Sequence, residues 1–409
     1  MDQAKKKERG SSKKKRKPVN LEREDFDAGP TNLDLIEPGL LLGNLTAATD
    51  VDALASHKIT HILTVDSCPL PRKITELPGI VTKFIQVTDL PKEDLLSHFE
   101  GAYEFITNGI EVGVVLVHCY FGVSRSATIV TAYLMKKHRI SYEEAIERVK
   151  SCRRFVGPNR GFIAQLCLYA DMGWCIDRDY LGYRLFRLQI SADKYQKAKI
   201  LPQSCSDVVK PDPAKITVRP EPIVYRCKKC RRIVASASDL IPHYKGISLS
   251  WQKGKSQLTR CNTVTSHNKS KQEVTTPTIE ETSAVGCSVM SNAVASLRSS
   301  TTVAGYVDNL QKIVTPGEVL TTNDCAMEDL PPLCVETFFV EPMQWMQLQV
   351  GHQTSCGKLY CPKCNTKLGS FNWESGCMCP CGAKCAPAFY LVPSKVERSN
   401  VVQNVQATV

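Results

Sequence analysis

The sequence predicts an α/β domain with a central, mostly parallel sheet, followed by a small cysteine-rich domain. Between about residues 38 and 175, apolar runs typical of buried strands alternate with segments of helical period. This alternation favours a parallel sheet covered by helices on both faces. Beyond residue 220, cysteine pairs separated by two residues occur on either side of a long polar segment. The length of 409 residues is sufficient for two or three domains.

Period and turn signals place the elements of the first domain in order along the chain. We expect strands at 39–43, 59–66, 81–88 and 113–117, and helices at 48–56, 93–105, 124–137, 141–151 and 159–174. In the 124–137 helix, Ile129, Tyr133 and Leu134 share one helical face, which predicts that they belong to the core.

A loop with unusual chemical content joins the 113–117 strand to the helix that follows. It reads His118-Cys119-Tyr120-Phe121-Gly122-Val123-Ser124-Arg125-Ser126. A short loop between a cysteine and an arginine can direct successive backbone N–H groups to one point, where the positive end of a helix starting near Ser124 also lies. We therefore predict a site for a phosphate dianion formed by His118, Tyr120, Phe121, Gly122, Val123, Ser124 and Arg125.

The residue types in this loop suit distinct roles. The positive field favours the thiolate of Cys119, which is the nucleophilic form, and Gly122 permits a tight backbone path. The forked guanidinium of Arg125 can bind two phosphoryl oxygens at once. Ser126 can donate to the sulfur and improve it as a leaving group, whereas His118 suits fixing the loop better than shuttling a proton. A buried, inert cysteine is the alternative, but the strand–loop–helix context favours an active site.

A proton donor for the leaving group is expected on the loop that ends the 81–88 strand. Asp89 lies on this loop, thirty positions before Cys119, where a general acid is usefully placed. Asp94 competes for the role, but it opens the next helix, and its charge there suits the positive helix end. A solvated loop aspartate without a catalytic role is the other interpretation of Asp89.

The span from about Pro38 to Cys175 resembles the dual-specificity protein phosphatases of the cysteine-based tyrosine phosphatase superfamily. Residues 118–126 match the family signature HCxxGxxRS in full, and Asp89 falls at the position of the family's general acid. Residues 153–162 resemble the segment after the signature helix, where Asn159 would brace the phosphate loop.

This resemblance implies the cysteine-based phosphatase fold and a two-step hydrolysis. Cys119 would attack phosphorus while Asp89 protonates the leaving oxygen, and water activated by Asp89 would then hydrolyse the phosphocysteine. The resemblance also implies activity on phosphotyrosine, phosphoserine and phosphothreonine of phosphoprotein substrates, without a catalytic metal.

Positive charge is concentrated at the N-terminus. The formal net charge is +11, of which residues 1–17 contribute +7. Blocks of like charge at 5–7 and 13–17 predict a disordered tail. Nuclear import is the leading interpretation, followed by binding to ribosomal RNA or another polyanion, and by a solubilising leader. Without a secretory signal or a run of membrane-spanning length, we expect an intracellular protein with no membrane attachment, whose 19 cysteines form no disulfide framework.

The cysteine-rich domain is interrupted by a polar segment. From about residue 245 to 329, Ser, Thr, Asn and Lys dominate, which predicts a disordered insertion. Cys227 and Cys230 form a CxxC pair before it, and Cys361 and Cys364 form another after it. In an intracellular chain such pairs indicate structural zinc held by thiolates rather than a redox site.

The region from about Tyr225 to Leu391, the insertion excepted, resembles the zinc-binding tail of one subgroup of these phosphatases. The matching pieces are 225–232, 339–346, 361–373 and 387–389. The resemblance implies two structural zinc ions, one on Cys227, Cys230, His243 and Cys334, the other on Cys361, Cys364, Cys379 and Cys381. Either Cys377 or Cys385 could replace Cys379 or Cys381, and the insertion makes His243 the weakest ligand. We expect Trp345, Phe371 and Trp373 to form a small core rather than a binding platform.

Two classes of function remain open at this stage. The first is a protein phosphatase, and the second is a binding protein in which phosphatase activity is secondary. The resemblance implies the second as well, because relatives of this type take part in maturation of the large ribosomal subunit, associating with pre-ribosomes in the nucleus and leaving them in the cytoplasm. We divide the chain into a basic tail at 1–28, a phosphatase domain at 30–190, a linker at 191–222, a zinc-binding domain at 223–392 and a flexible C-terminus at 393–409.

Overall fold

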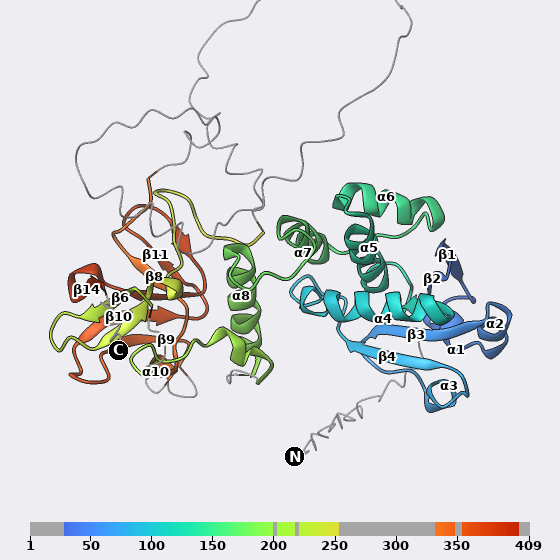
Figure 1. Ribbon diagram of the computed structural model, residues 1–409, viewed down its shortest axis with the longest axis horizontal. Helices are drawn as coiled ribbons and strands as arrows, with labels where there is room; N and C mark the ends of the chain where they lie inside the picture. The colour runs from blue at the N-terminus through green and yellow to red at the C-terminus, as the bar shows by residue number, and fades with distance from the viewer. Residues whose placement is uncertain (1–27, 199–202, 217–220, 253–331, 348–353, 401–409) are drawn as a thin grey trace, which may run out of the picture.

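The structure is a computed structural model that describes residues 28–198, 203–216, 221–252, 332–347 and 354–400 (Figure 1). The basic blocks at 5–7 and 13–17, residues 253–329 of the predicted insertion, and residues 401–409 lie outside this described part. Within it, every helix is too short or too polar to cross a membrane.

A five-stranded sheet forms the centre of the first domain, in the order β1-β2-β5-β3-β4. Its strands are β1 Leu33–Glu37, β2 Leu40–Gly43, β3 Ile59–Asp66, β4 Val81–Gln86 and β5 Val114–His118. Strand β1 is antiparallel to β2, whereas β2, β5, β3 and β4 run parallel. The predicted mostly parallel sheet is confirmed. Strand β1 was not predicted, because its residues are only partly buried and give a weak apolar signal.

Alternating side chains of the central strands belong to two separate apolar cores. One core joins Leu40, Leu42, Val115 and Val117 to the longer helices, which are α4 Phe99–Val112, α5 Arg125–His138, α6 Tyr142–Cys152 and α7 Arg160–Asp171. The other joins Leu41, Ile62 and Leu116 to the short helices, which are α1 Leu45–Thr49, α2 Val51–Ser56 and α3 Arg72–Thr75. Helices therefore cover both faces, as expected for parallel strands.

Two helices differ in the structure from the predicted ones, one because it is divided and the other because it begins later. The expected 48–56 helix is divided at Asp50, whose carboxylate accepts hydrogen bonds from the N–H groups of Asp52 and Ala53 and starts α2. The expected 93–105 helix is preceded by a 3₁₀ turn, η2 (Leu96–His98), and α4 begins only at Phe99.

Helix α8 (Leu181–Ala198) lies between the two domains (Figure 1). Its Tyr183, Phe186 and Ile190 belong to the core of the first domain. Leu188, Ala192 and Tyr195 belong to the core of the second. The predicted start of a linker at residue 191 was wrong, because the helix continues to Ala198 and contributes to both cores. Another short turn, η3 (Gln203–Val208), follows it.

The C-terminal domain consists of small antiparallel sheets. One has the order β8-β13-β10-β9, another β14-β6-β7, and a third pairs β11 with β12. Their bounds are β6 Ile223–Cys227, β7 Ile233–Ser236, β8 Phe338–Val340, β9 Cys356–Tyr360, β10 Lys367–Asn372, β11 Cys377–Met378, β12 Lys384–Cys385, β13 Ala388–Leu391 and β14 Val396–Asn400, with short helical turns at η4 Ala237–Asp239, α10 Gln344–Gln347 and η7 Pro393–Lys395. Trp345, Phe371 and Trp373 are buried in this core, as predicted.

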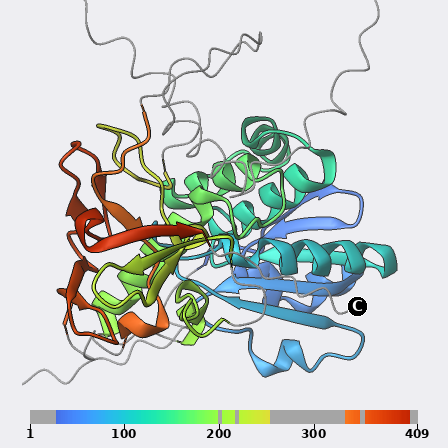
Figure 2. The ribbon, with the colours of Figure 1, turned by 60° about the vertical axis from the view of Figure 1, so that its left-hand side comes forward.

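Two segments that the sequence predicted to be flexible or disordered form part of this domain. The predicted flexible C-terminus at 393–409 was wrong for Val396–Asn400, because β14 pairs along all of β6 (Figure 2). The prediction of a disordered insertion from residue 245 was wrong for residues 245–252. Within 245–252, the N–H of Gly246 donates to the Cys381 carbonyl over 3.0 Å, and that of Leu249 to the Lys384 carbonyl over 2.8 Å.

Candidate active site and metal centres

The loop that follows β5 surrounds the sulfur of Cys119. Its Sγ accepts hydrogen bonds from the N–H of Gly122 over 3.2 Å and from the hydroxyl of Ser126 over 3.1 Å. Gly122 has a φ of 70°, and a β-carbon there would collide with the carbonyl of Gly43. Cys119 is only 2% exposed. Both donors stabilise negative charge on the sulfur.

The outer side of the loop is held through four successive carbonyl groups. The carbonyl of Tyr120 accepts from the N–H of Leu45, and that of Val123 accepts from the N–H of Gly157, each over 3.0 Å. Between them, the carbonyls of Phe121 and Gly122 accept from the guanidinium of Arg153, over 3.2 and 2.9 Å. Because the carbonyl oxygens are engaged on the outside, the N–H groups of the loop can point inward, toward the sulfur of Cys119 and a bound anion.

Arg153 was not singled out from the sequence, although it begins the matching segment 153–162. Its side chain is fully buried and also forms an ion pair with Asp34 over 2.5 Å. Its guanidinium lies 4.3 Å from the centre of the exposed Phe155 ring. A buried arginine that donates to the backbone carbonyl groups of a distant loop leaves no local signal in a single sequence. Its role is therefore visible only in the folded structure.

His118 is fully buried behind the loop. One ring nitrogen lies 2.8 Å from the hydroxyl of Thr64, and the other lies 3.2 Å from the carbonyl oxygen of Cys119. These contacts agree with the expectation that His118 fixes the loop.

Arg125, the first residue of α5, lies beneath the loop with an exposure of 7%. Its Nη1 donates to Asp66 over 2.6 Å and to the carbonyl of Val87 over 3.3 Å. Its Nε is buried and has no hydrogen-bond partner among the described residues. An unpaired buried donor is costly, so this atom is suited to receive an oxyanion. Asp66, which orients Arg125, was not predicted. It ends β3 beside β5, and carboxyl ends of parallel strands are where such residues gather.

Asp89 is connected to the loop through two hydrogen-bond donors. Its Oδ1 accepts from the hydroxyl of Ser124 over 2.8 Å and from the side-chain amide of Asn159 over 2.7 Å. Its Oδ2 lies 3.9 Å from Nε of Arg125. Asn159 also donates its backbone N–H to Ser124 over 3.1 Å and caps α7 by accepting from Phe162. The predicted acid and the predicted brace are therefore brought together beside Arg125.

Asp94, the competing acid, is engaged elsewhere. It is buried, and its Oδ2 accepts from Arg187 over 2.5 Å and from the Ser97 hydroxyl over 2.8 Å. Its Oδ1 accepts from the Ser97 N–H over 3.0 Å. Asp94 thus caps the turn before α4, much as expected for a residue at a helix start.

Eight predicted zinc ligands form two compact groups in the C-terminal domain, but in a different combination from that predicted. The first group is Cys227, Cys230, Cys361 and Cys364, and the second is His243, Cys334, Cys379 and Cys381. In each group the possible ligand atoms lie within 4.8 Å of one another. The predicted pairing by order along the chain was wrong, because the fold places the two CxxC turns face to face.

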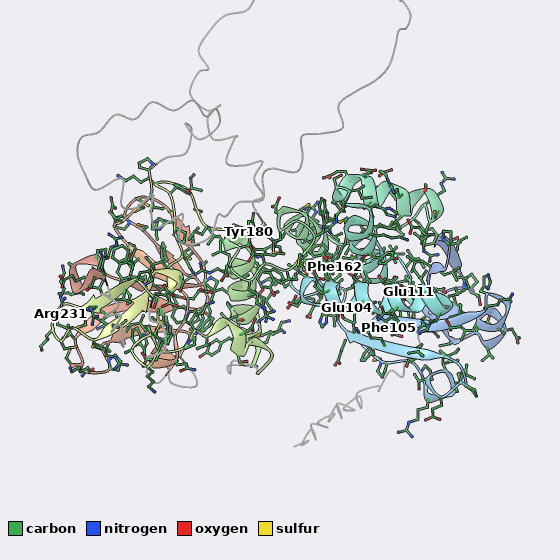
Figure 3. The ribbon with its side chains drawn as sticks, viewed as in Figure 1. Glu104, Phe105, Glu111, Phe162, Tyr180 and Arg231 are labelled. Atoms are coloured by element: carbon green, nitrogen blue, oxygen red, sulfur yellow. The ribbon has the colours of Figure 1, made fainter. Side chains whose placement is uncertain are left out.

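The two CxxC turns of the first group have the same backbone geometry. The N–H of Cys227 donates to the carbonyl of Arg232 over 2.8 Å, and the N–H of Cys361 donates to that of Thr366 over 2.9 Å. In each turn the fourth residue after the first cysteine has a positive φ, 64° at Arg231 and 55° at Asn365. Figure 3 shows Arg231 at the outer end of the domain. The sulfur atoms of Cys230 and Cys361 come within 3.5 Å.

The second group combines one histidine with three cysteines. Nε2 of His243 is buried and has no hydrogen-bond partner among the described residues, and the sulfur atoms of Cys334 and Cys379 lie 3.6 Å apart. Burial, together with the neighbouring thiols, raises the pKa of Cys334 to about 12. A cation would relieve both the unpaired nitrogen and the crowded thiols, so the donor set fits tetrahedral zinc.

Cys377 and Cys385, the alternative ligands, stand apart from both groups. They face each other across the β11–β12 pair. The thiol of Cys385 donates to the carbonyl of Pro387 over 3.3 Å, and burial raises its pKa to about 12. The structure therefore favours Cys379 and Cys381 in the second group.

Comparisons with known proteins agree along most of the chain. Residues 40–172 match the family described as the dual specificity phosphatase catalytic domain. Dual specificity protein phosphatase MPK-4 of Drosophila melanogaster is 44% identical over 95% of this chain and 93% of its own length. Dual specificity protein phosphatase 12 of Homo sapiens is 31% identical over 90% of this chain and 88% of its own. The solved Yvh1 phosphatase domain from Chaetomium thermophilum is 34% identical, with a TM-score of 0.34, over 36% of this chain and 99% of that domain.

Proposed function

This chain belongs to the dual specificity protein phosphatases, and from that premise we propose that it hydrolyses phosphoproteins through a covalent phosphocysteine on Cys119. The observation that carries the proposal is the sulfur of Cys119, which accepts from Gly122 and Ser126 at the start of α5. The Nε of Arg125, which has no hydrogen-bond partner among the described residues, lies in the same site and can donate to an anion.

In the first step the thiolate of Cys119 forms a bond to phosphorus as the bond from phosphorus to the serine, threonine or tyrosine oxygen breaks. Arg125 and the N–H groups of the loop bind the phosphoryl oxygens. Asp89 transfers a proton to the leaving oxygen. Because Oδ1 of Asp89 already accepts two hydrogen bonds, we assign the transferred proton to Oδ2.

In the second step water attacks phosphorus, and the bond from phosphorus to sulfur breaks. Asp89, now ionised, accepts a proton from that water. The hydroxyl of Ser126, 3.1 Å from the sulfur, stabilises the thiolate that leaves. The products are inorganic phosphate and the regenerated thiolate, so each residue returns to its starting form.

We further propose that two zinc ions stabilise the C-terminal domain, one on each group of four ligands. Zinc would supply a tetrahedral link between segments that are far apart in the chain. The first group joins residues near β6 to those after β9, and the second joins His243 and Cys334 to the turn after β11. We assign both ions a structural role.

Docking on a precursor of the large ribosomal subunit is a second candidate function. The basic blocks at 5–7 and 13–17 favour nuclear entry and binding to a polyanion. Under this proposal the chain would move between nucleus and cytoplasm. Co-sedimentation of the chain with ribosomal precursors, compared with a variant whose Lys13, Lys14 and Lys15 are replaced by glutamine, tests it. Sedimentation only as free protein would contradict it.

The decisive test of the phosphatase mechanism is Cys119→Ser, with Cys152→Ser as the matched control because Cys152 is exposed. We expect the first variant to lose turnover of a phosphopeptide and to keep its zinc content, while the control stays fully active. A phosphorylated intermediate trapped in Ser126→Ala by rapid acid quench would locate the covalent step. Retained turnover in Cys119→Ser would remove Cys119 from its role.

A further inference from the structure

Helix α8 lies beyond the segment that matches the catalytic family, yet it contacts the chain that follows Asp89. The family match ends at residue 172, whereas α8 spans Leu181–Ala198. In Figure 3, Tyr180 marks the start of this helix between the two domains. We call residues 89–94 the acid loop. Because α8 contacts this loop, the position of the helix can affect the position of the loop.

Arg187 of α8 makes the central contact. Its Nη1 donates to Asp94 over 2.5 Å and to the hydroxyl of Ser97 over 3.2 Å. Its other edge is held by Asp207, which accepts from Nε over 3.1 Å and from Nη2 over 2.9 Å. The side chains of Arg187 and Asp94 are 10% and 9% exposed. A planar guanidinium held on both edges fixes its partner more narrowly than a lysine could.

Residues 92–96, on both sides of Asp94, are also held by side chains of α7 and α8. The amide of Gln165 in α7 accepts from the N–H groups of Leu95 and Leu96 and donates to the carbonyl of Glu93. At the next position towards Asp89, Lys92 forms an ion pair with Asp193 of α8 over 3.3 Å. Lys92 is largely exposed, so this pair contributes less than the buried contact of Arg187.

The acid loop is therefore held at two ends. Asp89 is bound to Ser124 and Asn159 at one end, and Asp94 is bound to Arg187 at the other. Only four residues separate the two aspartates. A short segment loses much of its freedom when both ends are fixed, and general-acid catalysis depends on the place of the acid relative to the leaving oxygen.

We propose that Arg187 is a positioning residue for the general acid, so that a helix outside the matched catalytic region takes part in proton transfer. Arg187 acts through Asp94 and does not touch the phosphate site. The inference rests on the proposed role of Asp89. It distinguishes this chain from a catalytic domain that would end at the family boundary.

The readout is the dependence of the rate on the leaving group. Phenyl phosphate has a poor leaving group and needs the acid, whereas dinitrophenyl phosphate departs with little protonation. In the full chain, Arg187→Met should lower kcat/KM for phenyl phosphate by about 10-fold to 100-fold. The rate with dinitrophenyl phosphate should stay within about 2-fold of the wild-type value, because Cys119 and Arg125 are untouched.

Arg184→Met is the matched control. Arg184 lies one turn earlier in α8, is equally buried, and donates to Glu341 over 2.5 Å and to the carbonyl of Ser238 over 2.7 Å in the C-terminal domain. Both substitutions remove a buried ion pair and should lower the thermal midpoint. Only Arg187→Met should change the ratio of the two rates.

The outcomes separate this inference from the proposed function. Asp89→Asn should show the same selective loss in larger measure. If that variant shows no selective loss, Asp89 is not the general acid. If Asp89→Asn is selective but Arg187→Met slows both substrates equally or neither, Arg187 has no positioning role. The same selective loss in Arg184→Met would also overturn the inference. Should Arg187→Met fail to fold, Arg187→Lys decides, since it keeps the charge beside Asp94; an unchanged ratio in that variant refutes the proposal.

Discussion

Arg153 holds the phosphate loop from behind, through a hydrogen bond of 2.9 Å from its Nε to the carbonyl oxygen of Gly122. The two residues are far apart in the chain, and the same guanidinium also reaches the carbonyl of Phe121. This contact turns the carbonyl groups of the loop outward, which is the condition for its N–H groups to face an anion.

We predict that Arg153→Met lowers kcat/KM by about 10-fold to 100-fold, because the loop loses two of its outer contacts. The free energy of unfolding should fall by about 1–3 kcal/mol, since the buried carbonyl of Gly122 loses its partner. Steady-state kinetics and urea unfolding check both values. Arg154→Met is the control, because Arg154 is the exposed neighbour. Wild-type kinetics in Arg153→Met would show that the loop needs no such support.

Asp89→Asn should slow phosphatase turnover of poor leaving groups by about 10²–10⁴-fold, because an amide cannot donate the proton required at the leaving oxygen. The substitution keeps an oxygen that can accept from Ser124 and Asn159, so the loop should retain its position. Asp94→Asn serves as the comparison. If Asp94→Asn instead shows the larger loss, the acid has been assigned to the wrong aspartate.

The zinc groups seen in the structure and the groups predicted by order along the chain differ in the number of zinc ions that a double substitution should remove. Replacing Cys230 and Cys364 together by serine should remove one zinc ion per chain, because both residues belong to the first group. Replacing Cys230 and Cys381 together should remove two. Elemental analysis of purified protein measures both, and Cys377→Ser should leave the content unchanged. Loss of two ions from the first double variant would restore the pairing by chain order.

Removal of metal should destabilise the C-terminal domain selectively. Because ligands from segments separated by residues 253–331 meet in each group, a chelator such as EDTA should lower the unfolding temperature of that domain, and added zinc should restore it. Trp345 and Trp373 lie in its core, so tryptophan fluorescence reports the change. Fluorescence melting that does not respond to the chelator would contradict a structural role for zinc.

The raised pKa of Asp239 should make the stability of the fold depend on pH. Burial raises its pKa to about 6, with Glu221 and Glu341 adding to the effect against the hydrogen bond from Ser236. Since the folded pKa lies above the unfolded one, the protonated form stabilises the fold at low pH, and this contribution is lost as pH rises through about 6. Asp239→Asn should therefore gain about 1 kcal/mol relative to wild type between pH 5 and pH 7. Urea unfolding of both proteins at the two pH values measures the difference, and a constant difference would contradict it.

The elements that are regular and local were predicted closely. Strand β3 was expected at 59–66 and spans Ile59–Asp66, because a buried strand next to turn residues carries its own apolar signal. Helix α8 was missed for a physical reason: its apolar residues serve two cores on different faces, so no single stripe marks it. Strand β14 was missed because its residues other than Val396 are largely exposed.

The sequence alone determined the chemistry that lies within one short segment. In residues 118–126 the nucleophile, the anion-binding arginine and the glycine are neighbours, so their types and spacing already specify a phosphate loop. Only the tertiary structure decided the contacts between residues that are far apart in the chain. These are the contacts of Asp66 with Arg125, of Arg153 with the phosphate loop and of Arg187 with the acid loop. The combination of cysteines in each metal group was decided in the same way. The reason is that spacing along a chain constrains only nearby atoms, whereas these contacts depend on how strands and helices pack.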